Sequence, residues 1–464
     1  FTTLDWSVLI LFFIALGTII WWAIKQKQDS SEDYFLAGRN LGWFVIGSSI
    51  FASNIGSEHI VGLAGTAADS GMAMGHYELH SWIILLLGWV FVPFYLRSTV
   101  FTMPEFLERR YSESARWILT IITLVSYVLT KVSVTVYAGA VVFETLMGIE
   151  FWSGALLIVL VTGAYTILGG LRAVIYTDAL QAMVLLFGSI TITVTGLIKI
   201  GGWGNLIDQV GSSHFNMFLP YDHPDFPWVG MVFAPPIIGI WYWCTDQYIV
   251  QRVLSAKNER QARKGTIFAG YLKLLPIFMF FIPGLIAYAL SKSGQLNYTS
   301  SDQVFPTLVR ELLPSGLRGL VAGGLIAALM SSLSSVFNSC STLFTIDIYK
   351  KLKPNTSEKK LVFVGRVATA VVVITGILWI PLMKVVSSGG LYTYLQSVQA
   401  YIAPPIAAVF LLGLFWSRIN SSGALAALIG GFSAGMIRLG LEINKANLED
   451  GIWLSIAELN FLYF

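Results

Sequence analysis

Twelve long apolar stretches dominate this sequence and restrict what it can fold into. Each is long enough for the roughly 18–20 residues with which an α-helix crosses the hydrocarbon core of a bilayer. They lie at approximately 5–24, 41–70, 76–96, 117–147, 151–168, 174–198, 228–250, 266–290, 318–345, 361–384, 390–416 and 421–440. One more apolar segment starts near 452 and runs to the end of the chain. We therefore expect an all-α polytopic membrane protein.

The composition supports this expectation. Of the 464 residues, 55% are hydrophobic and 12% are charged, whereas a soluble domain carries about 25% charged residues to cover its surface. Soluble enzymes, nucleic-acid-binding proteins and disulfide-stapled secreted modules are therefore excluded. Both cysteines, Cys244 and Cys340, lie in apolar stretches, so we interpret them as small buried residues.

Lysine and arginine are distributed unequally between the two sets of alternate loops. Nineteen of them, Arg252 included, lie on one side of the predicted membrane and seven on the other. Because basic loops stay in the cytoplasm, the N-terminus is predicted to lie outside, in a plasma (inner) membrane. The long polar loop at 199–227 then lies outside, and we interpret its His214 and His223 as solvated residues.

The two ends of the chain carry few signals of their own. The sequence does not start with Met, and it stops within an apolar run, so we expect the natural protein to extend beyond both ends. The first helix has no basic segment before it and no small-residue cleavage site, which is unlike a signal peptide. With no linker or change of composition, residues 1–464 are predicted to form a single transmembrane domain.

Two of the spans are poor candidates for straight helices. The second contains a polar, glycine-bearing stretch from Gly47 to His59, and the seventh contains Pro235, Pro236 and Gly239. Backbone that leaves the helix at membrane depth must line a cavity or be buried in protein. Interrupted spans in corresponding positions indicate an inverted-repeat transporter, with repeats at 41–198 and 228–416, a leading helix at 5–24 and incomplete trailing helices at 421–464. The alternative is that these are kinks in tightly packed helices.

Few ionisable residues fall inside the spans, and such residues are costly there unless they have a function. They are Glu58, His59, Glu78, His80, Lys131, Asp178, Asp246, Lys273 and Arg366. A neutral sugar would need acceptors, donors, groups that do both and an aromatic face. Glu78 would be the acceptor and Lys273 the donor, and His59, Gln396 and Ser81 can do both. Tyr242 or Trp243 would provide the aromatic face. Each polar group left unpaired in a dry site costs about 1–3 kcal/mol, which supplies selectivity.

A cation site is predicted between the second and ninth spans. Ala328 lies one turn before Ser331 and Ser332, so a carbonyl and two hydroxyls can converge with carbonyls of the unwound stretch from Ala52 to Ile55. Five neutral oxygens suit a hard monovalent cation such as Na⁺; the alternative is that the serines only allow close helix packing. By contrast, His76-Tyr-Glu78-Leu-His80 has the wrong order for a zinc-protease motif.

Several longer motifs resemble the sodium/solute symporter family, in its sodium/glucose cotransporter branch. They are Ala52 to Gly65, Tyr165 to Asp178, Trp241 to Gln247, Ala328 to Lys350, and Tyr394-Leu-Gln396 leading into Pro404-Pro405. The resemblance covers essentially the whole chain. It implies a LeuT-like fold of 5+5 inverted repeats, with one extra leading helix and trailing helices.

The resemblance also implies roles for individual residues. The sugar site would comprise His59, Glu78, Ser81, Tyr242, Lys273 and Gln396. The gates would comprise Asn54, which holds Tyr242, with Leu63, Tyr77, Trp243 and Tyr392. The Na⁺ site would comprise Ala52, Ile55, Ala328, Ser331 and Ser332.

A second Na⁺ site is predicted from Asp178 with Ser331, Ser334 and Ser335, because one carboxylate and three hydroxyls on two helices can hold a cation. The alternative is that Asp178 caps its helix or pairs with a basic residue such as Arg172. Two features differ from the family pattern: Gly239 stands where some relatives have a polar side chain, and the 290–317 loop lacks the cysteines of animal relatives. The second feature favours a bacterial member, in which Asn297-Tyr-Thr is an accidental glycosylation sequon.

The predicted function is secondary active symport, in which inward Na⁺ flow drives uptake of a sugar such as glucose or galactose by alternating access. Alternatives are Na⁺-coupled symport of myo-inositol, sialic acid or an amino acid, and Glu78 disfavours a carboxylated solute. An intramembrane enzyme would need a nucleophile–base pair or a metal cluster, and a channel would not need broken helices. No organic cofactor, nucleic acid or obligate protein partner is expected.

Overall fold

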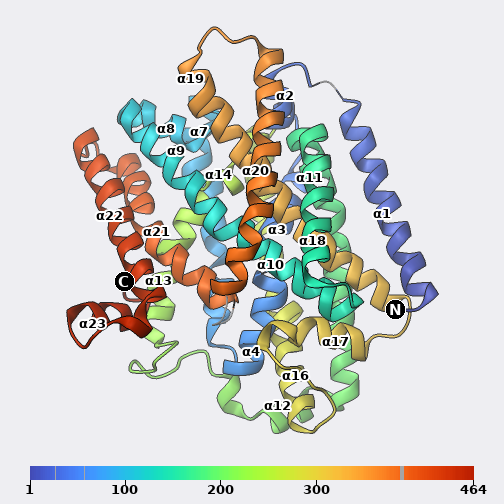
Figure 1. Ribbon diagram of the computed structural model, residues 1–464. Helices are drawn as coiled ribbons and strands as arrows, with labels where there is room; N and C mark the ends of the chain where they lie inside the picture. Colours follow the sequence, from blue (N-terminus) through green and yellow to red (C-terminus); the bar gives the residue numbers. More distant parts are fainter. Residues whose placement is uncertain (27, 57, 387–390) are drawn as a thin grey trace.

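A computed structural model describes residues 1–26, 28–56, 58–386 and 391–464. The described chain is a bundle of helices (Figure 1), in which Leu41 with Ala256 and Leu219 with Pro227 form isolated bridges. Ten helical stretches of the described chain are long and apolar enough to cross a membrane. The helical class predicted from the sequence is confirmed.

Ten such stretches replace the twelve expected for two local reasons. The second expected span is broken into α3 (Trp43–Asn54), a π-helical turn η2 (Glu58–Leu63) and α4 (Ala64–Ser70). The fifth and sixth form one element, α11 (Phe151–Ile200), of 50 residues. A straight helix of that length would measure about 75 Å, far more than a bilayer. The backbone turns at Gly170, whose φ of 57° and ψ of −157° are not helical.

Gly170 is required there for two reasons. Its positive φ is a conformation that residues with a side chain rarely adopt. A Cβ at this position would also lie 2.7 Å from the carbonyl oxygen of Tyr34, in the short helix α2 (Ser31–Leu36).

The other membrane-crossing segments are chains of α-helices joined by π or 3-10 turns. The third is η3 (Ala73–Gly75), α5 (His76–Leu79), η4 (His80–Trp82), α6 (Ile83–Leu86), η5 (Leu87–Phe91) and α7 (Val92–Ser98). The fourth is α9 (Glu113–Tyr127), η6 (Val128–Val132), α10 (Ser133–Val142) and η7 (Phe143–Met147). The seventh is α13 (Trp228–Gly239), η9 (Ile240–Thr245) and α14 (Gln247–Leu254). The eighth is α15 (Glu259–Leu272), η10 (Ile277–Phe281) and α16 (Ile282–Lys292). The ninth is α18 (Leu317–Thr342), η12 (Leu343–Tyr349) and α19 (Lys350–Leu352).

The remaining elements are simpler. The leading helix is α1 (Thr3–Ile24), and the last long helices are α20 (Glu358–Val386), α21 (Leu391–Phe415) and α22 (Ser421–Ile443). Short helices connect the spans: η1 (Ala37–Arg39), α8 (Met103–Arg110), α12 (Trp203–Val210), η8 (Ser212–Phe215), η11 (Ser301–Gln303), α17 (Val304–Leu312), η13 (Lys445–Asn447) and α23 (Ile452–Glu458).

The core of the bundle lies around α18, almost all of which is buried, whereas α1 and α22 expose most of their residues. α18 packs against α11 and α3, and α3 packs against α15. The end of α3 in the second segment and the turn η9 in the seventh are both buried, so protein rather than lipid surrounds their irregular backbone.

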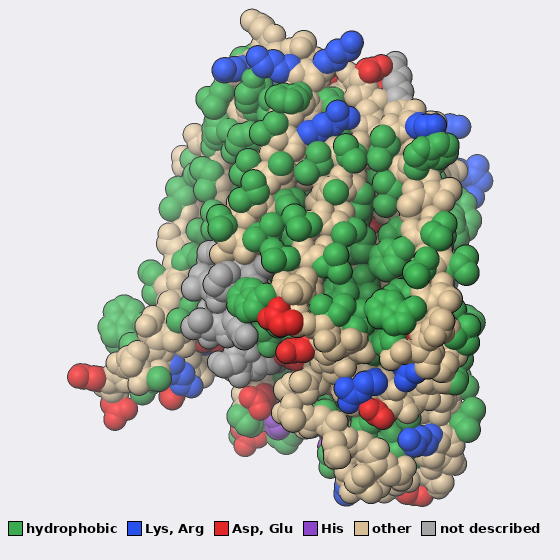
Figure 2. Space-filling view, turned by 45° about the vertical axis from the view of Figure 1, so that its right-hand side comes forward, with side chains coloured by type: hydrophobic (Ala, Val, Ile, Leu, Met, Phe, Trp, Pro, Cys, Tyr) green, Lys and Arg blue, Asp and Glu red, His purple; other side chains and the backbone are tan. Residues whose placement is uncertain are grey.

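Charge separates along the long axis of the molecule. The end that carries α2, α8 and α19 holds most of the basic loops, and the N-terminus lies at the other end with α12 and α17 (Figure 1). In Figure 2, Lys and Arg side chains gather at the upper end above a broad belt of hydrophobic side chains, and charges of both signs return at the lower end. Arg252 is an exception to the predicted loop positions, because it is fully buried in α14.

Candidate solute cavity and cation site

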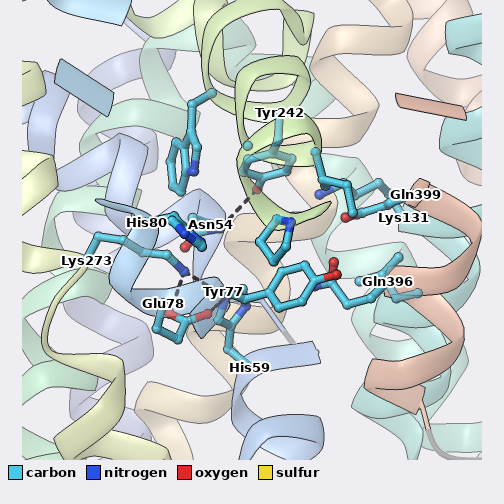
Figure 3. A pocket seen from close by; sticks show the side chains of 15 residues that line it. Asn54, His59, Tyr77, Glu78, His80, Lys131, Tyr242, Lys273, Gln396 and Gln399 are labelled. Atoms are coloured by element: carbon cyan, nitrogen blue, oxygen red, sulfur yellow. Dashed lines mark hydrogen bonds and ion pairs between the residues drawn. The ribbon is translucent and has the colours of Figure 1, made fainter. Parts of the chain in front are cut away.

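Both interrupted segments meet at a polar cavity in the middle of the bundle (Figure 3). About 50 Å³ of it is open to a water-sized sphere, well below the roughly 300–1,000 Å³ of ordinary small-molecule sites, so the cavity is narrow in this conformation. Its polar or aromatic lining residues are Asn54, His59, Tyr77, Glu78, His80, Lys131, Tyr242, Trp243, Lys273, Gln396 and Gln399.

Three ionisable side chains form a closed triangle on one wall. Lys273 Nζ donates to Glu78 Oε2 at 2.6 Å and lies 3.1 Å from His59 Nε2. His59 Nε2 is also 3.3 Å from Glu78 Oε1. All three side chains are buried. Since a buried charge is tolerated only when it is paired, Glu78 and Lys273 neutralise each other.

The triangle exists because three segments end or bend at this level. His59 lies in η2, Glu78 lies in the one-turn helix α5, and Lys273 is the residue at which α15 ends. A straight second span would have directed His59 elsewhere, so the break in that span positions one corner of the triangle.

Aromatic rings and an amide also line the cavity, and the Trp243 ring lies 5.7 Å from Lys273 Nζ. Asn54 Nδ2 donates to the hydroxyl of Tyr242 at 3.3 Å, and the Tyr242 and Trp243 rings meet edge to face at 4.9 Å between centroids. Lys131 Nζ lies 4.3 Å from the centre of the Tyr242 ring, which is a cation–π contact. The pairing of Asn54 with Tyr242 expected from the resemblance is present.

Among the polar atoms at the cavity that have no hydrogen-bond partner within the described chain are Asn54 Oδ1, Tyr77 Oη and Gln396 Oε1, and all three are buried. A buried polar atom without a partner costs about 1–3 kcal/mol. A hydroxylated solute that enters the cavity would provide the missing partners.

Some predicted residues lie elsewhere. Ser81 does not line the cavity; it lines a separate apolar groove with Trp82, because the backbone changes from α5 to the 3-10 turn η4 at His80, whose ψ is 21°. Leu63 is buried in the core beside α4. The side chain of Tyr392 lies outside the described residues. Gly239 does line the cavity, and a Cβ there would lie 2.5 Å from Ile83 Cδ1.

Three polar lining residues were not assigned to the site from the sequence: His80, Lys131 and Gln399. His80 and Lys131 did stand out as intramembrane ionisable residues. Gln399 lies one turn after Gln396 on α21, so their i,i+3 spacing was a signal that could have identified it.

The predicted cation site combines the end of α3 with the middle of α18. In a regular helix, the Gly56 and His59 amides would bond the carbonyls of Ala52 and Ile55. Here they donate to Asn54 and Gly56 instead, at 2.8 and 3.1 Å. The Ala52 and Ile55 carbonyls are thereby released from the helical pattern.

Two hydroxyls of α18 face the same region. Ser332 Oγ lies 3.4 Å from the carbonyl oxygen of Ser53, and Ser331 Oγ donates to Asp178. Carbonyl and hydroxyl oxygens of this kind fit a Na⁺ ion, and the ion would join the broken second span to α18.

The predicted second cation site is built differently from expectation. Asp178 Oδ2 accepts from Ser49 at 2.6 Å and Ser53 at 3.2 Å, and it pairs with Arg252 Nη2 at 3.3 Å. Arg252 also donates to Ser335. Ser334 Oγ donates to the Ser331 carbonyl at 3.0 Å. The partner of Asp178 is thus Arg252, since Arg172 donates to the Ala37 carbonyl.

The other histidines and the cysteines have local structural surroundings. His76 Nε2 bonds the Met217 carbonyl at 2.9 Å, His214 packs on the Tyr288 ring, and His223 Nδ1 accepts from the Phe226 amide at 3.0 Å. Cys244 and Cys340 are buried and unlinked, so the interpretation of both as buried residues is confirmed.

Comparison with known proteins agrees with this geometry. The model of the sodium:solute symporter family matches residues 34–431. The chain is 39% identical to human (Homo sapiens) sodium/myo-inositol cotransporter 2 over 497 residues, which covers 99% of this chain and 74% of that protein. It is 41% identical to sheep (Ovis aries) sodium/glucose cotransporter 1 over 473 residues, covering 94% of this chain and 71% of that protein.

Among solved structures, the chain resembles a Na⁺-coupled sialic acid symporter in a substrate-bound outward-open state. The TM-score is 0.83 with 22% sequence identity, over 100% of this chain and 96% of the other. The fold is therefore the LeuT-type fold predicted from the sequence. This chain belongs to the sodium:solute symporter family. It is a sodium-coupled solute symporter rather than an enzyme.

Proposed function

We propose that this symporter takes up a neutral sugar or cyclic polyol of hexose size. The observation that carries the proposal is the composition of the cavity. Its Glu78–Lys273 pair cancels in charge, buried oxygens of Tyr77 and Gln396 lack hydrogen-bond partners, and aromatic rings line the same cavity. A solute with many hydroxyls and no charge satisfies all three features. Two relatives, named as a sodium/glucose and a sodium/myo-inositol cotransporter, support the same class of solute.

Each side chain has a separate role in this proposal. Glu78 accepts hydrogen bonds from solute hydroxyls, Lys273 donates to them, and His59 donates or accepts. Gln396 Oε1 accepts from a solute hydroxyl. Tyr242 forms the stacking floor and, held by Asn54, closes the path beneath the solute. Trp243, Leu63, Tyr77 and Tyr392 belong to the gates. Ser81 would contact the solute only in a conformation in which the turn at His80 rearranges.

Na⁺ bound by Ala52, Ile55, Ala328, Ser331 and Ser332 couples ion to solute. The ion stabilises the broken conformation at Ile55, and that conformation places Asn54 and His59 at the cavity. Entry of each ion contributes about 2.3 kcal/mol per 100 mV of membrane potential. In this proposal the protein lies in the plasma (inner) membrane, its repeats span 41–198 and 228–416, and the end rich in lysine and arginine faces the cytoplasm.

The experiment is uptake into proteoliposomes of glucose, galactose, myo-inositol, sialic acid and neutral amino acids, each with an inward gradient of Na⁺ or of K⁺. We expect faster uptake with Na⁺ for a hexose or for myo-inositol. Na⁺-dependent uptake confined to sialic acid or an amino acid would overturn the neutral-polyol assignment.

A further inference from the structure

An apolar groove lies on the outside of the bundle, directly behind the wall that carries Glu78 and Lys273. It is lined by Trp82, Leu85, Trp89, Ile267, Tyr271 and Leu274, with Ser81 and Gly270 among its other lining residues. Five of these side chains, including Trp82, Trp89 and Tyr271, are among the exposed large hydrophobic residues of the chain. About 710 Å³ of the groove is open to a water-sized sphere, against about 50 Å³ in the solute cavity.

One end of the groove is positively charged. Arg263, Ile267 and Gly270 or Tyr271 recur at helical spacing along α15, so they share one face, and Leu274 follows in the turn after the helix. Arg263 lies 5.8 Å from the Trp89 ring, and its Nε donates to the Gly88 carbonyl at 3.3 Å. Arg260 and Lys264, both exposed, flank it on the same helix. Three cations therefore lie next to one end of the apolar groove, and one of them, Arg263, is paired with Glu259 at 2.6 Å.

The dimensions of the groove match one leaflet of a bilayer. From Arg263 the helix α15 continues for nine positions to Leu272, which corresponds to about 14 Å, and Leu274 follows in the next turn. Half of the hydrocarbon core is about 15 Å. A lipid acyl chain whose headgroup lies near Arg263 at the membrane interface would thus end near Leu274, close to the bilayer midplane.

We propose that this groove is a specific site for one anionic phospholipid of the leaflet at the basic end. The phosphate and its acidic headgroup lie at Arg263, Arg260 and Lys264, and one acyl chain lies between Trp89, Trp82 and Tyr271. A zwitterionic phospholipid has the same chain but a headgroup of zero net charge, so the cationic mouth selects the anionic one. Arginine suits this contact because its planar guanidinium binds phosphate through two hydrogen bonds.

The bound chain would act on solute binding through the backbone that it covers. Ser81 follows Glu78 by three residues, and Gly270 precedes Lys273 by three. The nearest heavy atom to a Cβ at Gly270 would be the Ser81 carbonyl oxygen, at 3.8 Å, so the two segments meet at the floor of the groove. A lipid packed on this floor holds the segments of Glu78 and Lys273 together. This consequence rests on the proposed sugar or polyol uptake; the lipid site itself does not.

Two variants and a matched control test the site. Arg263→Gln removes the cation at the mouth, and it also breaks the ion pair of Arg263 Nη2 with Glu259 Oε1 at 2.6 Å. Glu259→Gln breaks the same ion pair but keeps the cation, so it is the control. Gly270→Leu places a side chain in the groove, where a first carbon meets only ordinary contacts of 3.8 Å or more.

The measurement is native mass spectrometry of the purified protein after exposure to equal amounts of phosphatidylglycerol and phosphatidylcholine. We expect one retained phosphatidylglycerol in the parent and in Glu259→Gln. Retention should fall at least fivefold in Arg263→Gln and in Gly270→Leu. Equal retention of the two lipids by the parent, or undiminished retention in Arg263→Gln, would overturn the proposal. If Gly270→Leu does not fold, the comparison of Arg263→Gln with Glu259→Gln decides alone.

A second readout links the site to transport. In proteoliposomes, replacing phosphatidylglycerol by phosphatidylcholine should raise the solute concentration for half-maximal uptake several-fold in the parent. The same replacement should have little effect on this concentration in Arg263→Gln. Failure of all solutes to be transported would remove the proposed function but leave the mass-spectrometric result intact, so the two proposals fail separately.

Discussion

At the scale of single residues, the Glu78–Lys273 pair governs both stability and solute binding. Both side chains are buried, and they lie 2.6 Å apart. Removing one partner of a buried pair costs about 3–5 kcal/mol because the other charge is left uncompensated. We therefore expect Glu78→Ala to lose solute uptake and to unfold at a clearly lower temperature, measured by thermal denaturation of the purified protein.

The double variant Glu78→Leu, Lys273→Met separates these two effects. It removes both charges and replaces them with apolar groups, so it should recover most of the lost stability. It should still fail to transport. If it transports as well as the parent, the pair is structural and takes no part in binding the solute.

Gln396 presents the opposite case. Its Oε1 has no hydrogen-bond partner within the described chain, so Gln396→Ala removes no bond made by that atom. We expect an unchanged unfolding temperature with a half-saturation raised about 5- to 150-fold, which corresponds to losing about 1–3 kcal/mol of ligand hydrogen bonding. The measurement is the solute concentration for half-maximal uptake. If it is the same in Gln396→Ala as in the parent, Gln396 does not belong to the site.

At the scale of elements, the π-helical turn η9 decides where the cavity ends. It directs Tyr242 toward Asn54 and under Lys131. Tyr242→Ala should keep Na⁺ binding but let solute leak without Na⁺, since the floor of the cavity is gone. The measurement compares solute efflux with and without Na⁺, and Tyr242→Phe is the control because it retains the ring. Coupling as tight as in the parent would contradict the gate assignment.

The contact of α14 with α11 and α18 bears on how many ions are coupled. Arg252 in α14 already neutralises Asp178 of α11 and donates to Ser335 of α18. Ser334 contributes its hydroxyl to its own helix. With Arg252 in place we expect one Na⁺ per solute, and no change in Ser334→Ala, measured from the reversal potential. A parent ratio of two that falls to one in this variant would instead establish the second Na⁺ site.

At the scale of the whole molecule, the separation of basic loops predicts orientation. Cys244 and Cys340 are buried, so an introduced surface cysteine can be labelled over a low background. Asp222, in the loop between η8 and α13, and Lys353, directly after α19, are both exposed, and these two segments lie at opposite ends of the bundle (Figure 1). A membrane-impermeant maleimide applied to intact cells should label Asp222→Cys and should label Lys353→Cys only after the membrane is opened. The reverse pattern would invert the predicted topology.

Much of the fold could be predicted because lipid imposes strong local rules. A helix that crosses a bilayer must be long and apolar, and these properties are visible in α1, α20 and α22 from the sequence alone. Helix-breaking stretches around Asn54 and Pro235 were equally visible, because their residue types are unusual at membrane depth. The membrane class, the interrupted spans and the isolated polar residues were therefore all determined by the sequence.

Which polar groups meet was decided by tertiary structure. Glu78 and Lys273 are 195 positions apart, and no local rule indicates that α5 and the end of α15 converge. Arg252 follows a membrane segment and resembled a loop cation, yet the packing of α14 against α3 and α18 buries it beside Asp178. Ser81 shares a predicted helix face with Glu78, but a change of backbone at His80 turns it to the outside. Periodicity describes one helix at a time, whereas a site between helices depends on how their ends and bends are placed in space.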